Sequence, residues 1–314
     1  MLNRRHIRVK VMQSIFAMHQ NGSENLEKEE KFLLYSIENV QDLYLIMLSA
    51  LVEIVKKEAI YIEKSSRKHL ATAEERNPNK KFINNEIIRI LAENNSLNKA
   101  LAQRKIDNWT RNDDYILIIL NDIKKSDLYK KYMESGQNNF DEDRQFAIDM
   151  FIELIAPNDK LYDYLEDQRL TWIDDIPLVN TQIIKQMRQI KSGDDKAFQV
   201  PELYKDQEDK DFVKDLFRKT VLNETELAKE YIHKTPNWDT ERIAEIDTII
   251  LKMSICEFLK FPSIPIKVTI NEYLEIAKEY STPKSSIFIN GILDNLVKEF
   301  QADNKMTKSG RGLM

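Results

Sequence analysis

The apolar residues at both ends of the chain recur at the spacing of an amphipathic helix. Near the start, residues three or four positions apart form one stripe, made of Ile7, Val11, Ile15 and Met18. Near the end, a longer stripe is made of Ile289, Ile292, Leu293, Leu296, Val297 and Phe300. The 314 residues include only 6 Gly and 8 Pro, whereas strand-rich folds need more turn residues. We therefore predict an all-α protein.

The sequence contains no feature that indicates a membrane or a secreted protein. Its longest strongly apolar stretch, from Leu43 to Val52, is about half as long as a membrane-spanning helix. The N-terminus lacks a continuous apolar run followed by a cleavage site. The single cysteine, Cys256, cannot form an internal disulfide. We therefore expect a cytoplasmic protein.

Residue patterns typical of catalytic and cofactor sites are absent from the sequence. It has no phosphate-binding GxxxxGK[ST] loop, no dinucleotide-binding GxGxxG and no GxSxG nucleophile motif. The four histidines are never at metal-ligand spacing, and one cysteine cannot build a zinc site. We therefore expect no metal, no cofactor and no enzymatic activity.

The opening segment carries the densest basic cluster of a chain whose net charge is −5. Within "NRRHIRVKVMQSIFAMHQ" there are four cations and no carboxylate. Arg5, Arg8, Met12 and Phe16 fall on one helix face beside the apolar stripe. Arginines suit contact with nucleic-acid phosphates, and an aromatic ring suits base stacking. The alternative is an ordinary solvated helix face.

The two ends of the chain together resemble the NusB family of transcription antitermination factors. That family opens with RRxARExxxQxLY, and Arg4, Arg5, Arg8, Gln13 and Phe16 fall in its places. Its later motifs are matched by Trp238, Arg242, Asp247, Ile250, Leu251, Glu257, "IPIKVTINEYLEIAK" at 264–278 and "FINGILD" at 288–294. The sequence departs from the family at Val9, where Glu is common, at Phe16, where Tyr is common, and at Lys284, near where some members have Asp.

The resemblance implies an all-α RNA-binding adaptor in transcription antitermination. Its expected partners are a single-stranded boxA-like element in nascent RNA, a small-subunit ribosomal protein and, indirectly, the RNA polymerase elongation complex. The positions it assigns to RNA binding are Arg4, Arg5, Arg8, Phe16, Lys284 and Phe288, and Glu257 is assigned to the protein partner. From the residues alone, both phenylalanines could equally be core residues, and Glu257 an ordinary exposed acid.

The resemblance covers only part of the chain, which indicates an insertion. Residues 1–20 and 205–302 are expected to form a discontinuous RNA-binding domain, and residues 21–204 an inserted helical region. Residues 303–314 lack an apolar period and are expected to be a disordered tail.

Two other functions fit parts of the same pattern. A helical protein-interaction scaffold could keep the fold without binding RNA, because fold alone does not fix function. A NusB-like region also precedes the catalytic domain of some ribosomal RNA cytosine methyltransferases, but here only a short tail follows Phe300.

Overall fold

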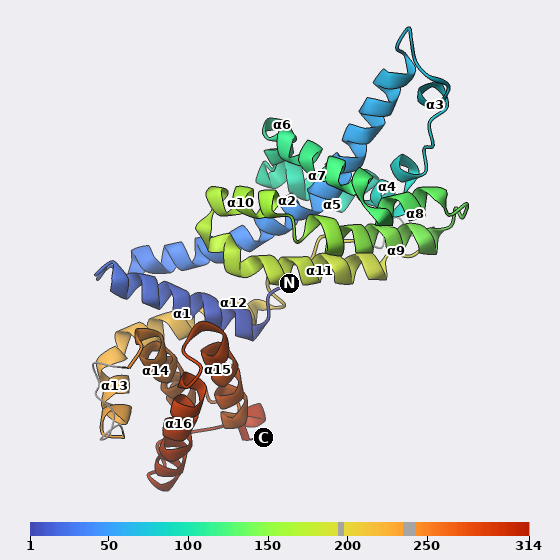
Figure 1. The fold of residues 1–314 in the computed structure, drawn as a ribbon. Helices are drawn as coiled ribbons and strands as arrows, with labels where there is room; N and C mark the ends of the chain where they lie inside the picture. The colour runs from blue at the N-terminus through green and yellow to red at the C-terminus, as the bar shows by residue number, and fades with distance from the viewer. Residues whose placement is uncertain (194–197, 235–242, 314) are drawn as a thin grey trace. The chain divides into compact units, whose positions relative to one another are not determined.

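The computed structural model describes residues 1–193, 198–234 and 243–313, and these ranges contain helices and loops but no strand (Figure 1). The predicted all-α fold is therefore confirmed. The chain divides into two compact units, and α2 (Leu26–Ser66) passes from one to the other. Unit 1 comprises Met1–Ile37 and Leu203–Met314, and unit 2 comprises Glu38–Glu202. None of the described helices combines the length and apolarity that crossing a membrane requires.

Unit 1 brings the start of the chain against its last third. Its elements are α1 (Arg4–Gln20), the first turns of α2, α12 (Gln207–Leu222), α13 (Glu224–Ile232), α14 (Glu245–Lys260), α15 (Ile266–Tyr280), α16 (Ser285–Ala302) and the 3₁₀ turn η5 (Gly310–Leu313). Helix α1, blue in Figure 1, packs against α12, α14 and α15, which are drawn in yellow to red. Segments separated by about two hundred positions thus share one core.

Helix α14 lies at the centre of unit 1. It packs against α1, α12, α13, α15 and α16. Nine of its residues from Ile249 to Phe258 are buried, on all sides of the helix. A helix that is buried all round must be covered by neighbours on every face. Two of the buried positions, Ser254 and Glu257, are polar and therefore need hydrogen-bonding partners.

Helix α1 is bounded by residues that suit its two ends. The Asn3 side chain accepts a hydrogen bond from the His6 backbone N–H, which caps the first turn. After Asn21 the chain turns at Gly22, whose φ of +58° suits glycine. The predicted stripes of α1 and α16 are buried, except that Val297 is only half-buried.

Unit 2 is a set of short helices around the remainder of α2. They are α3 (Ala73–Arg76), η1 (Phe82–Asn84), α4 (Glu86–Glu93), α5 (Asn95–Arg104), α6 (Asn108–Arg111), α7 (Asp113–Lys125), α8 (Asp127–Glu134), α9 (Phe140–Met150), η2 (Phe151–Ile155), α10 (Asp159–Gln168), η3 (Leu170–Asp175) and α11 (Ile176–Gln189). Asparagine side chains cap four of these helices, at Asn85, Asn94, Asn139 and Asn158.

The core of unit 2 is anchored on α2 by two tryptophans. The Trp109 indole N–H donates to the Ile46 carbonyl at 3.0 Å, and that of Trp172 donates to the Asn39 carbonyl at 2.8 Å. Both rings are buried. Unit 2 thus has a core of its own, as a domain requires.

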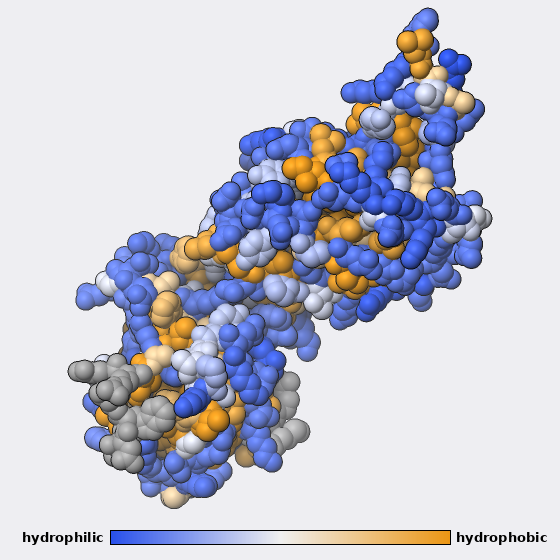
Figure 2. Space-filling view, in the orientation of Figure 1, coloured by the Kyte–Doolittle hydropathy of each residue, from blue (hydrophilic) through white to orange (hydrophobic). Residues whose placement is uncertain are grey.

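Most of the surface visible in Figure 2 is hydrophilic, with hydrophobic side chains in separate patches.

The division into units differs from the expected boundary at residue 20. The first three turns of α2 belong to unit 1, where Leu33 and Ile37 are buried and Glu30 accepts a hydrogen bond from Arg218 at 3.1 Å. A helix that runs through a domain boundary shows no break in its sequence pattern. The boundary could therefore not be placed from turn residues.

The C-terminal tail also differs from the disordered segment that its composition suggests. The Lys308 ammonium donates to the backbone carbonyls of Glu257 and Phe261 at 3.1 and 3.0 Å. The Ser309 N–H donates to the Pro262 carbonyl at 3.1 Å. The Glu257 and Phe261 carbonyls also accept the backbone N–H groups of Phe261 and Ile264, so Lys308 adds a second donor to each of them at the end of α14. The polar tail is ordered by backbone groups rather than by apolar burial.

Candidate nucleic-acid interface

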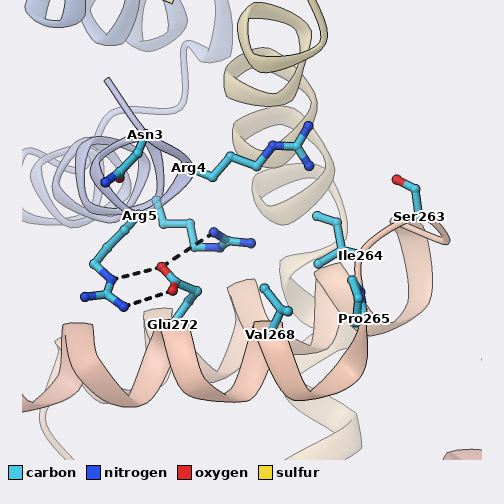
Figure 3. A pocket seen from close by; sticks show the side chains of 9 residues that line it. Asn3, Arg4, Arg5, Ser263, Ile264, Pro265, Val268 and Glu272 are labelled. Carbon is cyan, nitrogen blue, oxygen red and sulfur yellow. Dashed lines mark hydrogen bonds and ion pairs between the residues drawn. The ribbon is translucent and has the colours of Figure 1, made fainter. Parts of the chain in front are cut away.

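A cavity of about 590 Å³ opens beside the N-terminal end of α1 (Figure 3). Its walls come from α1, from the loop between α14 and α15, and from α15 itself. The lining residues are Asn3, Arg4, Arg5, Arg8, Ser263, Ile264, Pro265, Val268 and Glu272. The cavity therefore collects the three arginines of the opening segment at one place, with an apolar wall opposite.

Arg8 lies at the inner end of this cavity and is completely buried. Its side chain is 1% exposed, and its Nε and Nη2 donate to both oxygens of Glu257 at 2.6 and 2.8 Å. Thr269 and Tyr273 of α15 donate their hydroxyls to the same carboxylate, at 3.0 and 2.7 Å. We call these four residues the buried network. It ties α1, α14 and α15 together.

The charges of the buried network stabilise each other. Burial by itself lowers the pKa of Arg8, but the attraction and hydrogen bonds of Glu257 outweigh this effect, and the net pKa is raised. Burial, followed by the negative charge of Glu257, raises the pKa of Tyr273. Both shifts keep Arg8 charged and Tyr273 a hydrogen-bond donor. The carboxylate thus has four hydrogen bonds, which a buried ion requires.

Two of the site residues expected from the sequence are buried in this structure. Arg8 was expected to contact RNA and Glu257 to face a protein partner. Both side chains are buried, at 1% and 0% exposure, and each is the other's ion-pair partner. Both are engaged with each other inside unit 1, although Arg8 also lines the cavity. Their role in this structure is to hold α1 against α14.

Arg4 and Arg5 lie toward the open side of the cavity. Arg5 is 42% exposed, and its Nε and Nη2 each lie 2.9 Å from an oxygen of Glu272 on α15 (Figure 3). Arg4 donates to Asp209 at 2.8 Å and to Glu208 at 2.6 Å, and both carboxylates are on α12. We call Arg4, Arg5 and Glu272 the open rim. Its two cations are solvent-accessible but already paired.

The three remaining expected residues lie outside this cavity. Lys284 and Phe288 line a separate space of about 80 Å³ at the start of α16, together with Asp247 and Ser285. Lys284 is exposed, and the Phe288 ring is half-buried rather than free. Phe16, on α1, is also half-buried. The lysine and Phe288 are one helical turn apart, so they can act together.

Comparison with known proteins identifies the family of the chain. The sequence model of the NusB family matches residues 178–298. A protein of Salinibacter ruber named transcription antitermination protein NusB is 43% identical over 113 residues, which are 36% of this chain and 70% of that protein. The chain belongs to the NusB family. This confirms the resemblance seen in its sequence motifs.

Two further relatives in the NusB family carry the same name. The protein of Chloroherpeton thalassium is 40% identical over 105 residues, covering 33% of this chain and half of that protein. The protein of Koribacter versatilis is 39% identical over 100 residues, covering 32% of this chain and 68% of that protein. No solved structure matches the chain. The family model does not extend to α1, so the roles of its arginines depend on the geometry above.

Some residues of the NusB motifs lie outside the described part of the chain, among them Trp238 and Arg242. Asp247 is described and buried, and it accepts hydrogen bonds from Ser281 and Ser285, both at 2.6 Å. This carboxylate therefore joins the start of α14 to the start of α16.

Sequence reasoning missed the carboxylates that face the arginines. Glu272 lies inside the quoted motif "IPIKVTINEYLEIAK" but was given no role, and neither were Thr269 and Tyr273. Glu272 and Tyr273 lie three and four positions after Thr269, which places all three on one face of α15. That periodicity was a usable signal. Nothing local to Glu208 and Asp209 shows that they would meet Arg4.

Proposed function

We propose that this protein is a non-enzymatic RNA-binding adaptor in transcription antitermination. It would bind a single-stranded boxA-like element of nascent RNA, together with a small-subunit ribosomal protein, during ribosomal RNA synthesis. The observation that carries the proposal is the pair of solvent-accessible guanidinium groups, Arg4 and Arg5, beside an open cavity of about 590 Å³. The names of the relatives support the general role.

The chemistry of the open rim suits a single RNA strand. A planar guanidinium recognises phosphate oxygens through paired N–H donors. Unpaired bases of a single strand can stack on aromatic rings, and in this proposal the ring at the start of α16 is Phe288. The adjacent Lys284 would contact a phosphate, and Phe16 would extend the surface along α1. Arg8 is not part of this contact set.

A scaffold that keeps the fold without binding RNA is the second candidate. The observation that favours it is that Arg4 and Arg5 both have carboxylate partners. Their positive charge is thereby locally neutralised, which weakens attraction for a polyanion. RNA affinity and its salt dependence separate the two functions.

We expect the double variant Arg4→Ala/Arg5→Ala to lose RNA affinity and part of its salt dependence. Each phosphate contact on a single strand contributes about −0.7 to the slope of log K against log salt, so losing two flattens that slope by about 1.4. The measurement is fluorescence anisotropy with a single-stranded boxA-like RNA oligonucleotide, between about 50 and 200 mM salt.

The matched control is Arg67→Ala/Arg111→Ala in unit 2. Both of these arginines are exposed, and each pairs with one carboxylate four positions away. The control removes the same charge and should retain affinity and slope. If the parent protein shows no more RNA affinity than the Arg4/Arg5 variant, the scaffold function replaces the adaptor function.

A further inference from the structure

The arginine that is most accessible at the cavity already holds an anion. Glu272 occupies the Nε and Nη2 donors of Arg5 with both of its oxygens at 2.9 Å. The same edge of a guanidinium binds a phosphate through two parallel hydrogen bonds. The carboxylate therefore occupies the place that an RNA phosphate would take. A strand cannot use this edge until Glu272 has left it.

The pair is placed so that the carboxylate can leave. Arg5 and Glu272 are 42% and 22% exposed, in contrast to the fully buried pair of Arg8 and Glu257. An ion pair that retains contact with water contributes little free energy, because both ions keep much of their hydration. Breaking it costs correspondingly little. Both side chains line the cavity through which a ligand would approach.

The released carboxylate also has a second cation to move to. One oxygen of Glu272 lies 4.0 Å from Nη1 of Arg8. The hydrogen bonds of Arg8 to Glu257 use Nε and Nη2, and Nη1 is on the side toward Glu272. A small rotation of the Glu272 side chain would bring it onto this nitrogen. The carboxylate would then not be left without a partner.

We propose that Glu272 is an internal competitor for the RNA-binding edge of Arg5, and that RNA binds by exchange, with Glu272 shifting toward Arg8. This inference rests on the proposed function, which it extends by a mechanism of regulation. Because Glu272 must first be displaced, an anion needs a higher concentration to bind at Arg5. A single anion gains little by the exchange, whereas a strand that offers several phosphates at once can displace the carboxylate. The device therefore favours polyanions over small anions.

The test compares Glu272→Gln with Glu275→Gln in the full chain, using the same RNA oligonucleotide. Gln keeps the shape of Glu272 but removes its charge, so RNA affinity should rise by about two- to fivefold. Glu275 is the matched control. It lies on the same helix and attracts Arg5 from a distance, but its hydrogen-bond partner is Lys278.

The outcomes separate this inference from the proposed function. A gain for Glu272→Gln without a gain for Glu275→Gln supports the exchange. Equal gains for the two variants would show a long-range effect of charge, and no gain would show that the pair of Arg5 and Glu272 is purely structural. Either result overturns the exchange. If the parent protein binds RNA, the proposed function still stands. If neither the parent nor any variant binds RNA above Arg4→Ala/Arg5→Ala, both fail.

A second variant keeps the test valid if Glu272→Gln does not fold. Glu272→Asp retains the charge next to Arg8 but withdraws the carboxylate from Arg5 by one methylene. Its RNA affinity should lie between those of the parent and Glu272→Gln. An Asp variant that is folded by circular dichroism and binds RNA no more tightly than the parent overturns the exchange.

Discussion

The buried network and the open rim use the same pair of functional groups in different surroundings. In both regions an arginine of α1 donates two hydrogen bonds to a glutamate of a later helix. At the buried network the pair is excluded from water, and its carboxylate receives two further hydroxyl donors. At the open rim the pair remains in contact with solvent. Burial, rather than residue type, separates a structural arginine from one that can bind a ligand.

The free-energy consequences of the two surroundings are opposite. A buried charge that loses its partner has no water to replace it, so breaking the buried pair is costly. A half-exposed charge that loses its partner is rehydrated, so breaking the rim pair costs little. We therefore expect changes at the buried network to affect folding and changes at the open rim to affect binding. Three predictions, in order of expected effect, compare changes that should affect folding with changes that should affect binding.

The largest effect should come from Glu257→Ala. It removes both hydrogen bonds of Arg8 to a carboxylate, leaving only Glu272 at 4.0 Å, and it removes the acceptor of Thr269 and Tyr273. We expect the free energy of unfolding to fall by about 3–5 kcal/mol, measured by urea denaturation. Glu272→Ala is the control at the open rim, and it should cost less than about 1 kcal/mol. Equal costs for the two variants would contradict the distinction between the regions.

A smaller effect, on binding rather than on folding, should come from Phe288→Ala. If this half-buried ring stacks on one RNA base, its loss should weaken RNA affinity by about one to two decades, equivalent to about 1–3 kcal/mol. Ile287→Ala is the control, because Ile287 is adjacent, apolar, 75% exposed and not aromatic. A loss of about 3–5 kcal/mol of stability with intact RNA binding would instead identify Phe288 as a core residue.

The smallest effect should come from His6, which lies between the two regions on α1. Burial, followed by the positive charges of Arg5 and Lys10, lowers the pKa of His6 below its usual value near 6.5. Below that pH the unfolded chain binds a proton that the folded chain resists. The contribution of His6 to stability is therefore complete above about pH 6.5 and is lost as the pH falls.

The comparison of His6→Gln with the parent isolates this contribution from the other histidines. Urea denaturation of both proteins at about pH 7.5 and about pH 5 gives the loss of stability on acidification. The parent should lose more than His6→Gln. If both lose the same amount, His6 is protonated equally easily in the folded and unfolded chains, and the effect of burial on it is absent.

The sequence by itself determined the elements and the family. The stripes of α1 and α16, the Asn3 cap and the turn at Gly22 depend on residues within a few positions of one another, so they can be recognised locally. The motifs of the NusB family are likewise contiguous runs. The arginines at positions 4, 5 and 8 can be recognised as a group, because they share one region of one helix.

Only the tertiary structure decided how far each arginine is buried and which carboxylate it pairs with. The partner of Arg8 is 249 positions away and that of Arg5 is 267 positions away, on different helices. Which arginine is buried depends on how α14 and α15 pack against α1, because burial is set by the elements that cover a residue. The C-terminal tail is ordered because Lys308 and Ser309 donate hydrogen bonds to carbonyls at and just after the end of α14. Local patterns specify helices, whereas solvent exposure and charge pairing depend on contacts that form only when distant segments pack together.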